Sequence, residues 1–317
     1  MNDRATARAG ALRTLRVDAA TVALSSGLAR VGVRSILLKG PALGRWLYTD
    51  GAHRRYGDVD LLVSPADVET AGAALAAQGY HRSAFPAPQG HAISWEPPPA
   101  TPAQPSLDLH TTFHFVAVPD AVAWEVLSAG TERLRLGSGE VEVLGTPGRA
   151  LIVALHLALH GRGSGQQRED LDRAIAQAGL QTWAQAATLA QQLGTVDAMT
   201  AALRSTPDGA SLADQLELPK EVSPVAQLMV QSAPATSHGL LRLLESGSPA
   251  MRLRMIAAEL VPPRVQMLEH HPRARRGRVG LATSYVLRPF WLLRHLPAGL
   301  RAAKRARHGA AGPRPGP

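Results

Sequence analysis

The pattern of apolar and polar positions divides the chain into a first half that alternates strands with helices and a second half that is mainly helical. Residues 4–31 carry Ala, Leu and Arg at helical spacing and predict an N-terminal helix or a helix pair. The elements expected next are strands 35–39 and 58–63, helices 41–49 and 64–78, short strands in 80–85 and 91–95, strand 106–115, a hairpin of 131–136 with 140–144, and helix 146–160. Helical spacing with polar turns continues to about residue 268. This order predicts an α/β (α+β) fold with a small mixed sheet.

The predicted elements group into four successive parts. We expect an N-terminal helical segment (1–30), a mixed-sheet core (31–145), a helical domain (146–269) and a partly disordered basic tail (270–317). Residues 97–105 are rich in proline, which cannot donate to a strand ladder, and are expected to form an extended surface excursion.

Two carboxylates, Asp58 and Asp60, are the most informative residues for function. They stand at the start of a buried strand and are separated by Val59, so their side chains should point to the same side of the sheet. Two like charges this close are unfavourable unless a cation lies between them, and carboxylate oxygens suit Mg²⁺. The alternative is a pair of solvated acids at a strand start.

A second candidate, Lys39-Gly40, follows the apolar strand that precedes these acids. A glycine at a strand-to-helix turn lets the backbone approach a phosphate closely, and a lysine beside it can pair with that phosphate. Lys39 is one of only three lysines against thirty-one arginines, which indicates that a compact ammonium is wanted there. The alternative is an ordinary turn with a lysine that reaches to solvent.

Residues 37–63, LLKGPALGRWLYTDGAHRRYGDVDLLV, resemble the nucleotidyltransferases of the DNA polymerase β-like superfamily. Within it they are most similar to a bacterial branch with the pattern Leu-Lys-Gly, a helix ending in Tyr, an Arg, then Gly-Asp-Ile-Asp-Leu-Leu-Val. Two features depart from the wider superfamily: Gly40-Pro41 replaces its Gly-Ser or Gly-Gly turn, and the interval from Gly40 to Asp58 is longer. Both departures are shared by the branch.

The resemblance implies roles for further residues. Arg54 falls at the arginine position, where it would hold a phosphate, although it could instead pair with Asp58. Asp108, in Leu107-Asp108-Leu109-His110, matches the third carboxylate, which would complete the metal site and help to deprotonate the attacking hydroxyl. His110 shares its strand face and would line the substrate pocket, or make a structural hydrogen bond. The implied cofactor is Mg²⁺ (or Mn²⁺), with an NTP as co-substrate.

The implied reaction is transfer of a nucleoside monophosphate from an NTP to an acceptor, with release of pyrophosphate by a two-metal mechanism. The acceptor is not readable from the sequence, and a small molecule is favoured over RNA. One alternative is a toxin-like transferase that modifies RNA and grips it with the basic tail. Another is a catalytically idle nucleotide-binding protein, which the three intact acids argue against.

Two other pairs of residues are assigned no catalytic role. His156 and His160 share a helix face, but no third metal ligand is evident, and we expect this face to pack on the catalytic core. Asp170 and Asp172 lie in a helical segment, where positions i and i+2 diverge, and are expected to be solvated or at a pocket rim.

Charge is concentrated at the C-terminal end. Residues 1–269 carry twenty-five acids and twenty-three Lys and Arg (−2), whereas residues 270–317 carry eleven Lys and Arg and no acid (+11). The tail could contact nucleic acid or an anionic surface, or be a solubilising extension, and Pro289 and Pro297 are expected to interrupt any long helix in it. The chain has no cysteine, no apolar core of a signal peptide and no run of eighteen apolar residues, which predicts a cytoplasmic protein without a transmembrane segment.

Overall fold

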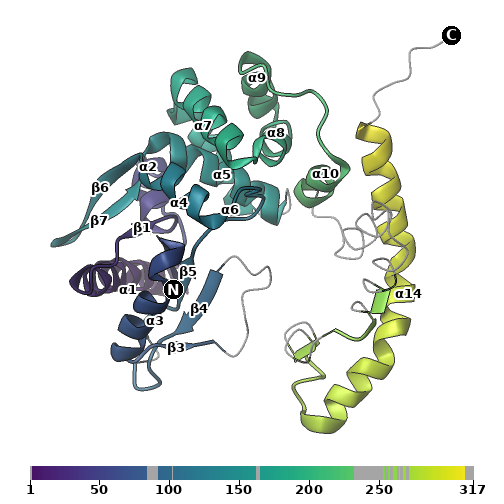
Figure 1. The fold of residues 1–317 in the computed structure, drawn as a ribbon, viewed down its shortest axis with the longest axis horizontal. Helices are drawn as coiled ribbons and strands as arrows, with labels where there is room; N and C mark the ends of the chain where they lie inside the picture. Colours follow the sequence, from purple (N-terminus) through teal and green to yellow (C-terminus); the bar gives the residue numbers. More distant parts are fainter. Residues whose placement is uncertain are drawn as a thin grey trace.

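A seven-stranded mixed sheet lies at one side of the molecule and a cluster of helices at the other (Figure 1). The computed structural model describes residues 2–83, 92–101, 103–161, 165–231 and 271–310, together with single residues between 253 and 268. The strands are β1 (Ser35–Leu37), β2 (Val59–Val63), β3 (His81–Arg82), β4 (Ala92–Glu96), β5 (Leu107–His110), β6 (Thr131–Leu136) and β7 (Gly139–Leu144). Their spatial order is β3-β4-β5-β2-β1-β7-β6.

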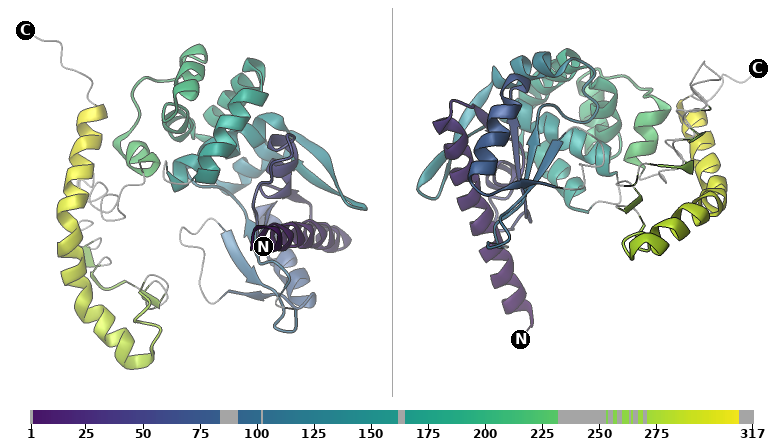
Figure 2. Two further views of the ribbon diagram at one scale, coloured as in Figure 1. Left: turned by 180° about the vertical axis from the view of Figure 1, so that it is seen from behind. Right: turned by 60° about the horizontal axis from the view of Figure 1, so that its bottom comes forward.

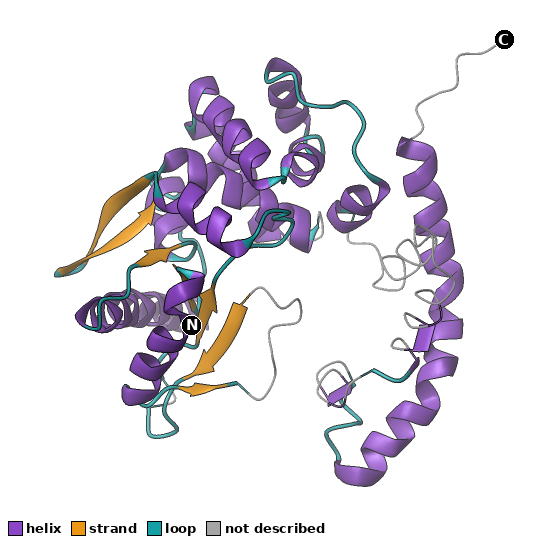
Figure 3. Ribbon diagram, in the orientation of Figure 1, coloured by secondary structure: helices purple, strands orange, loops and turns teal. Residues whose placement is uncertain are grey.

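The N-terminal helices lie around the strands, and the later helices gather beyond the sheet (Figure 3). The N-terminal part holds α1 (Asn2–Arg30), α2 (Pro41–Leu47), the 3₁₀ turn η1 (Pro65–Asp67), α3 (Val68–Ala77) and α4 (Asp120–Ser128). The helices that follow the sheet are α5 (Thr146–His160), α6 (Gly165–Gln177), α7 (Leu180–Leu193), α8 (Val196–Leu203), α9 (Pro207–Gln215), α10 (Pro224–Val230) and α14 (Gly277–Ala310). The expected α/β fold with a mixed sheet and a helical C-terminal part is confirmed.

The sheet is mixed because its central strands run in both directions. β2 pairs antiparallel with β1 and parallel with β5, β1 pairs parallel with β7, and the outer pairs β3–β4, β4–β5 and β6–β7 are antiparallel. Successive side chains of a strand point to opposite faces. Accordingly, Val59, Leu61 and Val63 pack against α1 and α3 on one face. Leu62 packs with the α5 residues on the other, so α5 lies behind the face to which Asp60 belongs. Figure 2 shows α1 running along its side of the sheet.

Several element boundaries follow from local chemistry. α5 begins at Thr146-Pro147, where proline's missing N–H costs nothing, and ends before Gly161 with a φ of 74°, as the sequence predicts. The hairpin of β6 with β7 and the pairing of β3 with β4 are also confirmed. The strand expected over 106–115 ends at His110, because Thr111 turns toward α4 and donates to Asp120 (2.7 Å). Residues 84–91 lie outside the described part.

The C-terminal region departs from one expectation. Pro289 and Pro297 do not interrupt the helix, since α14 continues through both. An interior proline removes a backbone hydrogen bond and bends a helix without having to end it. α14 packs on α10, and the Tyr285 hydroxyl donates to the Pro262 carbonyl (2.9 Å). The expected domain boundaries and the partial disorder of the tail stay predictions. None of the described helices combines the length and apolar character needed to cross a bilayer.

Candidate metal centre

Two neighbouring parallel strands bring the predicted acids together. In the register of β2 with β5, Asp60 lies beside Asp108, and Leu62 lies beside His110. The next strand, β4, places Ser94 beside Asp108, and its hydroxyl donates to Asp108 Oδ1 (2.6 Å). The parallel pairing therefore explains why residues forty-eight positions apart in sequence face the same site.

Asp60 is the buried centre of this site. It is 3% exposed, and its Oδ1 receives both Lys39 Nζ (2.9 Å) and His110 Nε2 (3.0 Å). Burial alone would raise the pKa of Asp60, but the Lys39 ammonium and the His110 hydrogen bond outweigh burial and hold this pKa well below its ordinary value. Asp60 is thus a carboxylate that stays charged inside the protein.

The residues around Asp60 have the composition of a cation site. One ligand atom from each of Asp60, Asp108 and His110 lies within 4.8 Å of the other two, and this is the one such group of three acidic or imidazole side chains in the described part of the chain. Carboxylates suit Mg²⁺ and Mn²⁺, whereas an imidazole ligand suits transition metals. The donor set therefore fits a divalent cation.

Asp58 directly precedes β2 and is exposed. It is outside the group formed by Asp60, Asp108 and His110. Partial loss of water around its carboxyl group, together with repulsion from Asp60, raises the pKa of Asp58 despite the nearby Lys39. A cation would relieve that repulsion. Its role as a metal ligand stays a prediction, as does that of Asp108.

Lys39 offsets part of the negative charge of the acidic cluster in the free protein. It follows β1, and the Leu38 N–H donates to the Asp60 carbonyl (3.0 Å), so the backbone brings the Lys39 side chain to the acids. Burial opposes the charge of Lys39, but Asp60 and, more weakly, Asp58 and Asp108 raise its pKa above the usual value. Lys39 therefore remains an ammonium while it faces the carboxylates.

Gly40 has a backbone conformation that other residues rarely adopt, with φ 58° and ψ −117°. Its α-carbon also faces Tyr56, whose ring would contact any added Cβ. α2 has only seven residues and begins with Pro41, which has no N–H to offer a phosphate. A phosphate role for this turn therefore depends on Lys39 more than on the end of the helix.

Arg54 has a different partner from the one the sequence indicated. Its guanidinium does not pair with Asp58 but is buried against Asp170 of α6, with Nε 3.0 Å from Oδ2 and Nη2 2.9 Å from the same oxygen. Tyr48 donates to the other carboxylate oxygen of Asp170 (2.8 Å). The expectation that Asp170 is solvated is wrong: it is 1% exposed, whereas Asp172 is exposed and pairs with Arg168. Asp170 shares the buried face of α6 with Leu171 and Ala174, a periodicity that could have identified it.

The loop that carries Arg54 to the acids is fixed from both sides. On the α1 side, Asp18 is buried and accepts hydrogen bonds from Tyr56 (2.7 Å) and Arg45 (2.8 Å). On the α6 side, Asp170 holds Arg54, and Gln166 donates to the Arg55 carbonyl (2.9 Å). Asp18 is a residue that sequence reasoning missed. These contacts position the segment that ends at Asp58.

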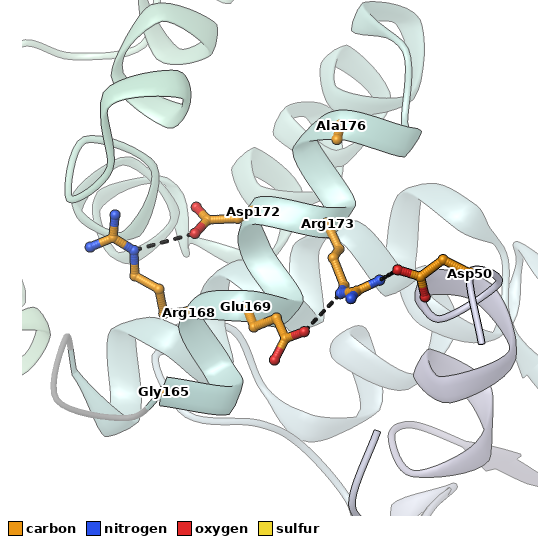
Figure 4. Close-up of a pocket in the computed structure, with 7 residues that line it drawn as sticks. All are labelled: Asp50, Gly165, Arg168, Glu169, Asp172, Arg173 and Ala176. Carbon is orange, nitrogen blue, oxygen red and sulfur yellow. Dashed lines mark hydrogen bonds and ion pairs between the residues drawn. The ribbon is translucent and has the colours of Figure 1, made fainter. Parts of the chain in front are cut away.

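A surface pocket of about 450 Å³ lies over α6 beside Asp50 (Figure 4). Its charged groups are paired with each other: Arg173 bridges Glu169 and Asp50, both at 3.0 Å, and Arg168 faces Asp172. Arg173 also donates to the Leu47 carbonyl (3.3 Å). The pocket is therefore part of the contact that holds the loop after α2 against α6.

His156 and His160 lie on α5, where His156 is half-buried and His160 is exposed, and the expectation that their face packs on the catalytic core stays a prediction. Their rings are perpendicular with centroids 4.6 Å apart. Burial, followed by the positive charge of Lys39, lowers the pKa of His156 well below its ordinary value. His156 Nδ1 is buried and has no hydrogen-bond partner among the described residues. His156 is thus a neutral imidazole within the electrostatic influence of Lys39.

Comparison with known proteins identifies one family. The model of a family described as uncharacterised nucleotidyltransferase matches residues 4–207, which include α1, the whole sheet and the helices through α8. No curated protein matches the chain. Among solved structures, an antigenic nucleotidyltransferase-like protein from Paracoccidioides brasiliensis is similar at 15% identity and a TM-score of 0.41, over 64% of this chain and 93% of that chain.

Proposed function

The chain belongs to this nucleotidyltransferase family, and on that premise we propose that it transfers a nucleoside monophosphate from an NTP to an acceptor and releases pyrophosphate. The observation that supports the reaction is the pairing of Asp60 with Asp108 on adjacent parallel strands, beside a charged lysine. We further propose that it lies in the bacterial branch with the Leu-Lys-Gly and Gly-Asp-x-Asp motifs, and that it acts in the cytoplasm.

Asp60, Asp108 and Asp58 are the residues that would hold divalent cations, with His110 as a further ligand or as the group that orients Asp60. Bound Mg²⁺ or Mn²⁺ would supply charge stabilisation to an in-line displacement at phosphorus. Asp60 contributes a carboxylate that stays ionised. The Ser94 hydroxyl donates a hydrogen bond to Asp108 Oδ1 and so orients this carboxylate. Asp108 Oδ2 would then be available to take the proton of the attacking hydroxyl or to bind the cation.

Lys39 would exchange partners during substrate binding. In the free protein its ammonium offsets Asp60. When cations take over that role, the ammonium can turn to a triphosphate oxygen, with which it forms a charge-assisted hydrogen bond. Arg54, by contrast, acts through position: its buried pair with Asp170 fixes the loop that ends at Asp58, so we propose a positioning role for Arg54 in place of direct phosphate contact.

A small molecule is our preferred acceptor. Residues 1–269 carry a net charge of only −2, and the excess of basic residues is concentrated in the tail, which can be separate from the site. An RNA acceptor held by the tail is the second candidate, favoured by the +11 charge of residues 270–317. An idle nucleotide-binding protein is the third.

One experiment separates these functions. The full-length protein is incubated with each α-labelled NTP, Mn²⁺ or Mg²⁺ and a cell extract, and the labelled species is identified. A labelled small molecule supports the preferred acceptor, and labelled RNA supports the second. NTP binding without any labelled product in all combinations would indicate an idle nucleotide-binding protein and contradict the proposed reaction.

A further inference from the structure

A second pocket, of about 520 Å³, lies between α1 and the starts of β2 and β5, the two strands that carry Asp60 and Asp108. Its lining includes Arg13 and Arg16 from α1, Gly57 before β2, Glu96 at the end of β4, and Gln104 and Ser106 before β5. Gly57 directly precedes Asp58, and Ser106 lies two residues before Asp108. The Val59 N–H donates to the Ser106 carbonyl (3.0 Å), so both strand starts meet at the pocket. The pocket thus lies at the end of the sheet where β2 and β5 begin, although none of the acids of the candidate metal centre lines it.

The two arginines supply the pocket's positive charge. They stand three residues apart and therefore share one side of α1. Both are exposed, and neither forms an ion pair with any acid among the described residues. Arg34, Arg45, Arg54, Arg149, Arg173 and Arg204, by contrast, each contact a carboxylate at 3.0 Å or less. Guanidinium groups without a carboxylate partner, in a concave site, are suited to a phosphate.

Gly57 leaves room for one of these guanidinium groups. A Cβ atom at position 57 would collide with Nη2 of Arg13, so the side chain of Arg13 lies directly on the α-carbon of Gly57. The backbone of Gly57 is outside the left-handed region, so its conformation does not itself require glycine. The space above Gly57 is what Arg13 uses to reach the residue next to Asp58.

Glu96 indicates that the ligand carries a hydrogen-bond donor in addition to a phosphate. One carboxylate among two arginines leaves the lining positive, and it can accept a hydrogen bond from a hydroxyl or amine. We propose that this pocket binds a phosphate group of a substrate of the transfer reaction, with Arg13 and Arg16 as the phosphate ligands and Glu96 facing a polar group of the same molecule. The phosphate belongs either to the acceptor or to the NTP. The assignment of the phosphate to a substrate of the transfer reaction rests on the proposed function. The binding of an anion by this pocket does not.

The test uses four full-length variants. Arg13→Ala/Arg16→Ala removes both ligands, and Gly57→Ala displaces the flexible Arg13 side chain while leaving Arg16 in place. Arg30→Ala is the matched control, because Arg30 is an exposed arginine of the same helix, outside the pocket. Asp60→Asn removes the central acid of the metal site without touching the pocket. Binding of inorganic phosphate, inorganic tripolyphosphate and Mg-ATP is measured by calorimetry, and thermal unfolding confirms that each variant is folded.

We expect the double variant to bind phosphate and tripolyphosphate at least about tenfold more weakly than the wild type, the scale of losing charge-assisted hydrogen bonds. Gly57→Ala should show a smaller loss, and Arg30→Ala and Asp60→Asn should show none. A parallel loss of Mg-ATP affinity assigns the pocket to the NTP, whereas unchanged Mg-ATP affinity assigns it to a phosphorylated acceptor.

Equal anion affinities in the double variant and Arg30→Ala would overturn the inference, as would failure of the wild type to bind either anion. Anion binding that depends on Arg13 and Arg16, in a protein that transfers no label, would leave the pocket in place while contradicting the proposed reaction. Loss of label transfer in Asp60→Asn with anion binding retained would support both the phosphate-binding pocket and the proposed reaction.

Discussion

Asp170→Asn should be among the most destabilising single changes in the helical part of the chain. Asp170 is 1% exposed and is the partner of Arg54, which is also buried, so the amide would leave a buried guanidinium without its countercharge. Removing one partner of a buried ion pair costs about 3–5 kcal/mol in free energy of unfolding. The Tyr48 hydroxyl would keep an acceptor, because the amide retains one oxygen. We therefore expect a loss of about 3 kcal/mol.

Asp172→Asn is the matched control on the same helix. Asp172 is exposed and pairs with Arg168 at i, i+4, a type of pair worth about 0.2–0.5 kcal/mol. Urea unfolding followed by circular dichroism gives both free energies under the same conditions. Equal losses in the two variants would refute the assignment of Asp170 as a buried structural partner.

Arg54→Met/Asp170→Leu completes the test by removing both charges. Replacing a buried pair by apolar side chains is often neutral for stability, so this double variant should be markedly more stable than Asp170→Asn. If Arg54 instead contacts phosphate directly, the double variant would be stable yet lose NTP affinity to the same extent as Lys39→Ala. A positioning role predicts a smaller loss of NTP affinity than that.

Three further predictions test the electrostatics of the site and the tail. Lys39→Ala should weaken Mg-NTP binding by about 1–3 kcal/mol in calorimetry, whereas Lys220→Ala should not, and equal affinities would show that Lys39 is only a turn residue. Because the pKa of His156 is lowered in the folded protein, the unfolded chain binds the extra proton first as the pH falls through about 6.5. Stability should then drop by up to about 1.4 kcal/mol per pH unit from this group, and His156→Gln, but not the exposed His81→Gln, should reduce the slope in urea unfolding. If RNA is the acceptor, deleting residues 270–317, which removes a charge of +11, should abolish salt-dependent RNA binding, whereas with a small-molecule acceptor the deletion should leave turnover nearly unchanged. Mg-NTP binding should be retained in both cases, and its loss would mean that the tail belongs to the folded core.

The sequence predicted those parts of the site that local patterns determine. Alternation along β2 placed Asp60 on the face opposite Val59, and the helix from Thr146 to His160 was bounded by proline and glycine. The family resemblance supplied Asp108, which the register of β2 with β5 then set beside Asp60.

Contacts between residues far apart in the sequence could not be predicted from local patterns. Arg54 and Asp170 are 116 residues apart, and a charged residue on a helix gives no local sign of the partner that will bury it. The contact of Lys39 and His110 with a single oxygen of Asp60 likewise depends on how β1, β2 and β5 come together. Pro289 and Pro297 indicated interruptions, but α14 continues through both, because an interior proline bends a helix without having to end it.

The most direct measurement of the central claim is metal-dependent label transfer by the wild type, Asp60→Asn and Asp108→Asn, each with an α-labelled NTP, Mn²⁺ and cell extract. An amide keeps the shape of the side chain but loses the charge that holds the cation. The account predicts a loss of at least about a thousandfold in rate for both variants, or about 4 kcal/mol of activation free energy, with Asp172→Asn unchanged. Near-full transfer by both Asp60→Asn and Asp108→Asn would contradict the assignment of these carboxylates as the catalytic centre.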